Sequence, residues 1–228
     1  MHVPVLLDRC IELLGPALSA PDAILVDATL GLGGHSEALL STFSDLTLVG
    51  VDRDPIALVK AGERLAKFGD RFVPRAGEHE NLASLLATVN GGRINAILFD
   101  LGVSSMQLDE PSRGFSYSRD APLDMRMNPQ DELNAAQIVN TYSEAELVGV
   151  LRDFGEERSA RRIAKAIIAA RNNAPITSTA ELAELVRDAI PQAAKRTGGH
   201  PAKRTFQALR IEINREIQGL PAALDAAL

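Results

Sequence analysis

In Val26-Asp27-Ala28-Thr29-Leu30-Gly31-Leu32-Gly33-Gly34-His35-Ser36, an apolar strand pattern runs through a glycine-rich turn into the start of a helix. Glycines allow a backbone to approach a ligand closely, and the N-terminus of the following helix offers free N–H groups. The segment from Val26 to Asp52 therefore predicts a Rossmann-like cofactor site. A glycine-rich turn is shared by many proteins of this kind and does not by itself identify the cofactor.

Two acidic residues narrow the choice of cofactor. Asp52 ends the second strand pattern, 21 residues after Gly31, where a carboxylate accepts hydrogen bonds from a ribose diol. Asp27 precedes the glycines, where it would repel the pyrophosphate of a dinucleotide and attract the sulfonium and ammonium groups of S-adenosylmethionine. The alternative is that Asp27 only caps the turn. His35 is expected either to contact the cofactor or to be an ordinary residue at the helix start.

The first hundred residues alternate between strand and helix patterns, which predicts a parallel sheet with right-handed crossovers. The expected strands are Ala23–Ala28, Leu46–Val51, Arg71–Pro74 and Ile94–Phe99. The expected helices between them are Gly34–Thr42, Pro55–Lys67 and Glu80–Val89. Asp54 is a plausible N-cap for the second of these helices, because Pro55 is tolerated in a first turn.

After Asp100 the pattern changes. Residues 102–129 resemble a long ordered loop that carries function, and residues 134–194 are expected to be helical. The expected helices are Ser143–Phe154, Glu156–Ala170, Ser178–Ala189 and Thr205–Gln218, the first and third with capping boxes begun by Ser143 and Ser178. The sequence thus predicts an α/β fold with an inserted all-helical domain. Its fourth strand would be an open edge, because the chain ends in helical Pro221–Leu228.

Composition sets broader limits. The chain has 228 residues and a single cysteine, Cys10, which excludes an internal disulfide and favours the cytoplasm. No apolar run is long enough for a membrane helix. Residues 1–151 carry 11 Lys/Arg and 21 Asp/Glu, whereas residues 152–216 carry 13 Lys/Arg and 8 Asp/Glu. This asymmetry indicates an anionic partner for the second half; an ordinary solvated helical surface is the alternative.

Several further stretches carry a specific resemblance. They are His2–Leu7, Asp27–Ser36, Asp52–Pro55, Asp100–Asp109, Arg113–Ser116, Pro122–Met127, Gly155–Arg158 and His200–Ile211. With these stretches the chain resembles the MraW/RsmH family of bacterial 16S ribosomal RNA cytidine-N4 methyltransferases. The resemblance covers nearly the whole chain in order. It implies a Rossmann-like class I methyltransferase sheet that is incomplete at the C-terminus, and S-adenosylmethionine as cofactor.

The resemblance also implies roles for individual residues. The implied cofactor contacts are Gly33, Gly34, His35, Asp52, His79, Asp100 and Gln107. His79 stands where the family usually has phenylalanine, so it would cover adenine with less apolar area. The helical insertion is expected to recognise 16S rRNA in the small ribosomal subunit. The preferred RNA-binding candidates are Arg126, Lys203, Arg204 and Arg210. Phe115 and Tyr117 are aromatic candidates, but for Phe115 and Phe206 core packing is the favoured interpretation.

The expected domains are a cofactor domain at residues 1–110, an inserted recognition domain at 111–203, and a return to the core at 204–228. The family continues with further strands and a Ser-Phe-His-Ser-Leu-Glu-Asp-Arg-like segment that this sequence lacks, which predicts that the native chain is longer. The sequence does not predict the oligomeric state.

Asp100 ends the fourth strand at the edge where open α/β sheets bind ligands. We expect Asp100 or the Leu101 carbonyl to accept hydrogen bonds from the amine that is methylated; a purely cofactor-binding role for Asp100 is the alternative. No metal site is expected, since His2, His35, His79 and His200 are widely spaced. Two other functions are considered: a nicotinamide-dependent oxidoreductase, which Asp27 disfavours, and a non-catalytic RNA- or cofactor-binding fragment.

Overall fold

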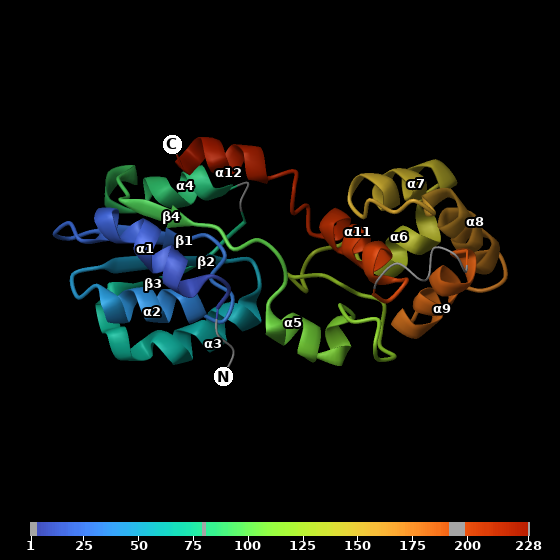
Figure 1. The fold of residues 1–228 in the computed structure, drawn as a ribbon, viewed down its shortest axis with the longest axis horizontal. Coiled ribbons are helices and arrows are strands. Elements are labelled where there is room, and N and C mark those ends of the chain that lie inside the picture. The colour runs from blue at the N-terminus through green and yellow to red at the C-terminus, as the bar shows by residue number, and fades with distance from the viewer. Residues whose placement is uncertain (1–3, 79–80, 192–198, 228) are drawn as a thin grey trace. The chain divides into compact units, whose positions relative to one another are not determined.

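The computed structural model describes residues 4–78, 81–191 and 199–227. The chain divides into two compact units (Figure 1). We name Met1–Ser104 with Ile217–Leu228 the core unit, and Ser105–Glu216 the helical unit. The sequence pattern instead predicts a return to the core over residues 204–228. Contacts within the chain place Lys203–Ile213 in the helical unit. The limits of the functional domains stay a prediction.

The core unit contains a four-stranded parallel sheet in the order β3-β2-β1-β4. The strands are β1 Ile24–Asp27, β2 Thr47–Asp52, β3 Phe72–Ala76 and β4 Ala96–Leu98. All four predicted strands are confirmed, with ends that differ by at most two residues. Because the strands are parallel, their carboxyl ends lie at one edge of the sheet. Asp27 and Asp52 are the last residues of β1 and β2 at this edge.

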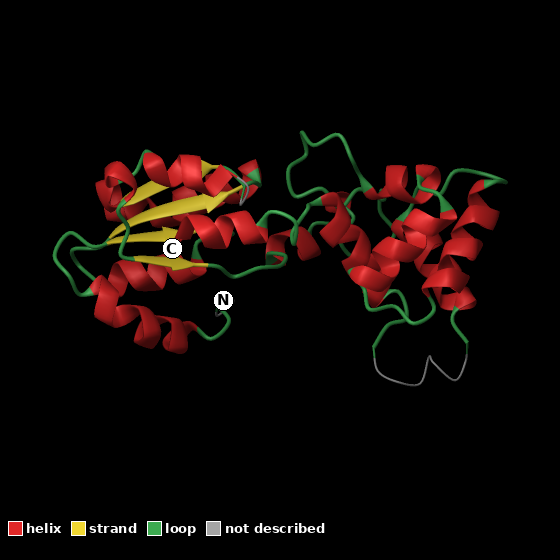
Figure 2. Ribbon diagram, turned by 90° about the horizontal axis from the view of Figure 1, so that it is seen from above, coloured by secondary structure: helices red, strands yellow, loops and turns green. Residues whose placement is uncertain are grey.

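Helices cover both faces of this sheet, as Figure 2 shows. They are α1 Leu7–Leu18, α2 Gly34–Thr42, α3 Pro55–Leu65, α4 Leu82–Ala87 and α12 Leu220–Ala227, with short 3-10 turns η1 Ala66–Arg71 and η3 Asn90–Gly92. Successive strand residues point to opposite faces. Leu25 and Leu48 accordingly pack in the cluster that contains residues of α1, α2 and α3, whereas Val26 and Val49 pack with α4 and α12.

The start of α3 follows the sequence prediction. Asp54 is its N-cap, and the Asp54 side chain accepts a hydrogen bond from the Ile56 N–H at 3.0 Å. The predicted helix at Glu80–Val89 is shorter in the structure, where α4 spans Leu82–Ala87. Helix α1 was not predicted. Its polar residues interrupt the apolar run, but Ile11, Leu14 and Leu18 share the face that packs on the core.

The helical unit contains no strand among its described residues. Its elements are α5 Ser105–Asp109, η4 Pro111–Arg113, α6 Ala135–Thr141, α7 Glu144–Asp153, α8 Ala160–Arg171, α9 Thr179–Ala189 and α11 Lys203–Ile213. The capping box predicted at Ser143 is confirmed. The box predicted at Ser178 is half formed: Ser178 caps α9, but the Glu181 carboxylate accepts from the Thr177 N–H rather than from that of Ser178.

Candidate functional site

The glycine-rich turn links the end of β1 to α2. Gly31 and Gly33 have positive φ angles of 51° and 72°, a conformation that side chains with a Cβ disfavour. Gly33 is the N-cap of α2, and a Cβ on it would lie 3.1 Å from Leu65 Cδ1. The turn is also fixed to the sheet, because the Leu30 N–H donates to the Val51 carbonyl at 3.0 Å. The glycines therefore serve both the backbone geometry and the packing of α3 on the turn.

The side chain of Asp27 is buried and accepts hydrogen bonds from residues of this turn and of the helix that follows it. Its side chain is 2% exposed, its Oδ1 accepts from the Thr29 N–H at 3.2 Å, and its Oδ2 accepts from the Ser36 hydroxyl at 2.6 Å. Burial raises the pKa of the Asp27 carboxyl above its usual value. These contacts favour the alternative in which Asp27 caps the turn. A buried acid at this position still opposes the approach of a pyrophosphate.

Asp52 holds the turn from the neighbouring strand. Its Oδ2 accepts from the Gly31 N–H at 2.7 Å, and its Oδ1 accepts from the Asp54 N–H at 2.9 Å. Burial raises the pKa of the Asp52 carboxyl to about 6. A carboxylate has about four lone-pair sites, so each Asp52 oxygen can accept one further hydrogen bond. The partly exposed carboxylate thus fits the two hydroxyl donors of a ribose diol.

His35 joins three segments of the chain. Its ring is part of a residue that is 8% exposed, with Nε2 2.9 Å from the Val5 carbonyl oxygen and Nδ1 3.7 Å from Asp100 Oδ2. Because a carbonyl only accepts, this contact places a proton on Nε2. A Cβ on Gly34 would lie 2.8 Å from Pro4 Cγ. The segment at Pro4 and Val5 therefore supports the turn, which analysis of the residue patterns alone did not predict.

Asp100 lies just beyond β4, at the same edge of the sheet. Its N–H donates to the Thr29 hydroxyl at 2.6 Å, which fixes its backbone beside the glycine-rich turn. Its side chain is 51% exposed, in contrast to the buried Asp27. An accessible carboxylate can accept hydrogen bonds from a ligand or substrate amine. The structure thus brings together Gly33, Gly34, His35, Asp52 and Asp100 around one turn.

Two predicted cofactor contacts are not placed at this turn. His79 lies outside the described residues. Gln107 belongs to α5 of the helical unit, where it is 5% exposed. Their roles, like those of the other candidate site residues, stay predictions.

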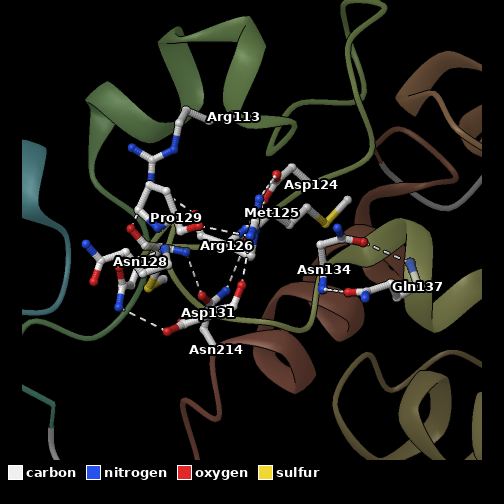
Figure 3. A network of polar contacts seen from close by, with 12 residues as sticks. Arg113, Asp124, Met125, Arg126, Asn128, Pro129, Asp131, Asn134, Gln137 and Asn214 are labelled. Atoms are coloured by element: carbon white, nitrogen blue, oxygen red, sulfur yellow. Dashed lines mark hydrogen bonds and ion pairs between the residues drawn. The ribbon is translucent and has the colours of Figure 1, made fainter.

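Two of the RNA-binding candidates have internal partners. All three guanidinium nitrogens of Arg126 are engaged: Nε and Nη2 with the Asp124 carboxylate at 2.8 and 2.7 Å, and Nη1 with the Pro129 and Asp131 carbonyls (Figure 3). This pairing lowers the pKa of Asp124 against the opposing effect of burial, and raises that of Arg126. Arg210 forms a two-point ion pair with Glu216, at 2.7 and 2.9 Å.

The same network contains Asn214, which is 1% exposed. Its Oδ1 accepts from the Met127 N–H at 2.7 Å, and its Nδ2 donates to the Met125 carbonyl at 2.9 Å. Met125 is fully buried and has a φ of 64°. The stretch Pro122–Met127, which carries part of the family resemblance, is therefore locked to the end of α11. Arg126 therefore has a structural role in this network, and its contacts do not support a role in RNA binding.

The remaining candidates differ in exposure. Lys203 and Arg204 are exposed at the start of α11, and Arg204 Nη1 donates to the Glu156 carbonyl at 2.9 Å. Phe115 and Phe206 are 6% and 3% exposed, in agreement with core packing. Tyr117 is half-buried, and its ring stacks on that of His200 with 4.5 Å between centroids.

Residues 4–78, 81–191 and 199–227 contain no group of three or more His, Cys, Asp or Glu side chains arranged to hold a metal ion. No helix in these same ranges is long and apolar enough to cross a membrane.

The sheet order, the glycine-rich turn after β1 and the carboxylate at the end of β2 are those of a Rossmann-like methyltransferase fold. The chain belongs to the MraW methylase family, whose model matches residues 1–228. The resemblance seen in the sequence is thereby confirmed.

Similar proteins from several organisms carry the same name. A protein named Ribosomal RNA small subunit methyltransferase H from Mycolicibacterium smegmatis is 59% identical over 232 residues, which cover all of this chain and 62% of that protein. Proteins of the same name from Mycolicibacterium gilvum and Streptomyces avermitilis are 60% and 55% identical, again over the whole chain, and are covered to 61% and 71%. The chain thus spans about three fifths of the length of its mycobacterial relatives.

Proposed function

We propose that this protein transfers a methyl group from S-adenosylmethionine to small-subunit ribosomal RNA, at the N4 amine of a cytidine in 16S rRNA. The family and the names of the relatives support methyl transfer to small-subunit rRNA. The observation that carries the proposal in the structure is the pairing of the glycine-rich turn with Asp52. A ribosomal substrate would place the protein in the cytoplasm.

The residues of the core unit fit the proposed cofactor. Each carboxylate oxygen of Asp52 can accept one further hydrogen bond, as the ribose diol requires. The positive φ of Gly31 favours glycine, and the absence of a Cβ there lets a ligand approach the backbone of the turn. The buried carboxyl of Asp27 lies under the turn, and an acidic group there suits a cationic ligand better than a pyrophosphate. When bound, S-adenosylmethionine would supply an electrophilic methyl group on a sulfonium centre.

The proposed acceptor is a poor nucleophile, because the lone pair of an exocyclic cytosine amine is delocalised into the ring. A carboxylate that accepts from the amine N–H would favour the nucleophilic form. Asp100 is the exposed carboxylate at this edge, and its backbone is held by Thr29. We therefore assign Asp100 to positioning of the amine. Much of the rate would come from alignment of amine and methyl group.

The variant Asp100→Asn separates this role from cofactor binding. We expect kcat to fall by roughly 100-fold, as for loss of a positioned acceptor. The Kd for S-adenosylmethionine, measured by calorimetry, should change less than about threefold. An equal loss in kcat and in cofactor affinity would assign Asp100 to the cofactor instead.

The alternative to be tested is a non-catalytic RNA- or cofactor-binding role. The test is methyl transfer from S-adenosylmethionine with an isotope-labelled methyl group, to small ribosomal subunits and to naked 16S rRNA, with the modified nucleoside mapped by mass spectrometry. Label in N4-methylcytidine supports the proposal. Tight cofactor binding by a folded sample that transfers no label to either substrate would favour the binding role.

A further inference from the structure

Helix α8 and the turn before it carry an unusual concentration of positive charge. Residues 158–171 contain five Lys or Arg and no Asp or Glu. Four of these cations lie close together in the sequence: three share one side of α8, and the fourth lies in the turn before the helix begins at Ala160. They are Arg158, Arg161, Arg162 and Lys165, and we name them the basic face.

All four side chains of the basic face are exposed. Within the described ranges, none of them takes part in an ion pair or a side-chain hydrogen bond. Other arginines of the helical unit differ in this respect. Arg152 pairs with Asp153 and Arg187 pairs with Asp188, each at 3.0 Å. The basic face therefore presents charge that is not neutralised within its own unit.

The position of these charges costs helix stability. Arg161 and Arg162 lie in the first turn of α8, which contains no acidic residue. The helix dipole disfavours cations at this end. The opposite side of the helix, formed by Ile163, Ala164 and Ile167, is buried in the unit. The arginines thus oppose local stability without contributing to the core, which points to an external anionic partner.

Neighbouring elements extend this surface. Arg161 also lines an open hollow between α7 and α8, where the other charged residues are Glu144 and Arg152, the latter paired with Asp153. On the other side, Arg204 at the start of α11 reaches the Glu156 carbonyl, two residues before Arg158. The charged surface therefore continues from α8 toward the exposed start of α11.

We propose that the basic face binds the phosphate backbone of the RNA substrate. This inference rests on the proposed function for the identity of the anion. Arginine guanidinium groups match phosphate geometry, and Arg161 and Lys165 lie one turn apart, roughly 6 Å along the axis. An anionic membrane fits less well, because an interfacial helix exposes large apolar residues beside its cations. The exposed large apolar residues of the described chain include none from 158–171.

Phosphate contacts position an RNA without reading its sequence. The basic face should therefore bind RNA of any sequence, with affinity that falls as salt rises. This role differs from that of Arg126 and Arg210, whose guanidinium groups already hold Asp124 and Glu216.

The test compares two variants that each remove two positive charges. R161Q/R162Q neutralises half of the basic face. R9Q/R187Q is the matched control, because Arg9 and Arg187 are exposed arginines in ion pairs with Glu12 and Asp188. The Kd for a single-stranded 16S rRNA fragment is measured from 50 to 300 mM KCl by fluorescence anisotropy, and binding of S-adenosylmethionine and circular dichroism check the fold.

Loss of two phosphate contacts on single-stranded RNA should reduce the magnitude of the slope of log K against log salt concentration by about 1.4. The Kd at 0.1 M salt should be weaker by about 25-fold. The control variant should stay within about twofold of wild type. Equal weakening of RNA binding in both variants would overturn the proposal that the basic face binds RNA. An unchanged Kd in R161Q/R162Q while wild type binds RNA would overturn it as well. Absence of RNA binding by wild type itself would instead count against the proposed function. Binding to phosphatidylserine vesicles that is lost in R161Q/R162Q, with RNA affinity retained, would also overturn it.

Discussion

The raised pKa of Asp52 predicts that cofactor affinity falls as pH falls. The carboxyl accepts from the Gly31 and Asp54 N–H groups, and burial raises its pKa to about 6. An unperturbed aspartate has a pKa of about 3.9. Asp52 therefore begins to bind a proton below about pH 6, where ordinary aspartates are still ionised. A protonated carboxyl loses acceptor capacity toward a ribose diol, so the protonated form should bind the cofactor poorly.

The size of the effect follows from the pKa. If only ionised Asp52 binds, the apparent Kd is multiplied by one plus the ratio of protonated to ionised carboxyl. With a pKa of about 6, Kd is unchanged at pH 8 and rises about 11-fold at pH 5. In the ligand-free protein the same shift has the opposite consequence. The folded state binds this proton more tightly than the unfolded state. The contribution of Asp52 to the free energy of unfolding is therefore present below about pH 4 and is lost as the pH rises from about 4 to about 6.

The assay is calorimetric titration with methylthioadenosine between pH 5 and pH 8. This ligand keeps the adenosine diol but has no group that ionises in the range, which separates Asp52 from the charge effects of Asp27. The variant Asp52→Asn should bind weakly at every pH, with no pH dependence. A wild-type Kd that is constant from pH 8 to pH 5, or an equal pH dependence in Asp52→Asn, would refute the reasoning.

Two further predictions concern the helical unit. Asn214→Ala leaves the buried Met127 N–H without its acceptor, so it should lower the free energy of unfolding by about 3 kcal/mol; a urea midpoint within error of wild type would contradict this. Gly114 has a φ of 69°, and a Cβ there would lie 2.3 Å from the Pro122 carbonyl oxygen. Gly114→Ala should therefore destabilise the unit by more than about 2 kcal/mol in the same urea assay, and an unchanged midpoint would show that the loop adjusts freely.

The core unit could be predicted from sequence because its signals are local. Strands β1, β2 and β4 are short apolar runs, and Asp52 ends β2 at the carboxyl end of a parallel strand. The N-cap role of Asp54 is equally local, since donor and acceptor are two residues apart. Helix α1 is not among the elements predicted from the sequence, because charged residues break up its apolar run, although Ile11 and Leu14 keep a helical spacing on the packed side.

Contacts between distant residues could not be predicted in this way. Asn214 binds the backbone of Met127, 87 residues away. The Val5 carbonyl meets His35 across 30 residues. Arg126 looked like a free cation in the sequence, yet the fold of the loop brings two carbonyls and the Asp124 carboxylate around it. Charge in a sequence therefore indicated which half of the chain is basic, but the structure was needed to separate paired arginines from the basic face.

The proposed function depends most directly on the identity of the ligand at the glycine-rich turn. The decisive measurement is calorimetry of the purified chain with S-adenosylmethionine and, separately, with NADH, alongside the variant Asp52→Ala. We predict one molecule of S-adenosylmethionine bound per chain, no binding of NADH, and loss of S-adenosylmethionine binding in Asp52→Ala because the diol acceptor is removed. Binding of NADH in place of S-adenosylmethionine, or undiminished S-adenosylmethionine binding by Asp52→Ala, would contradict the assignment of this site.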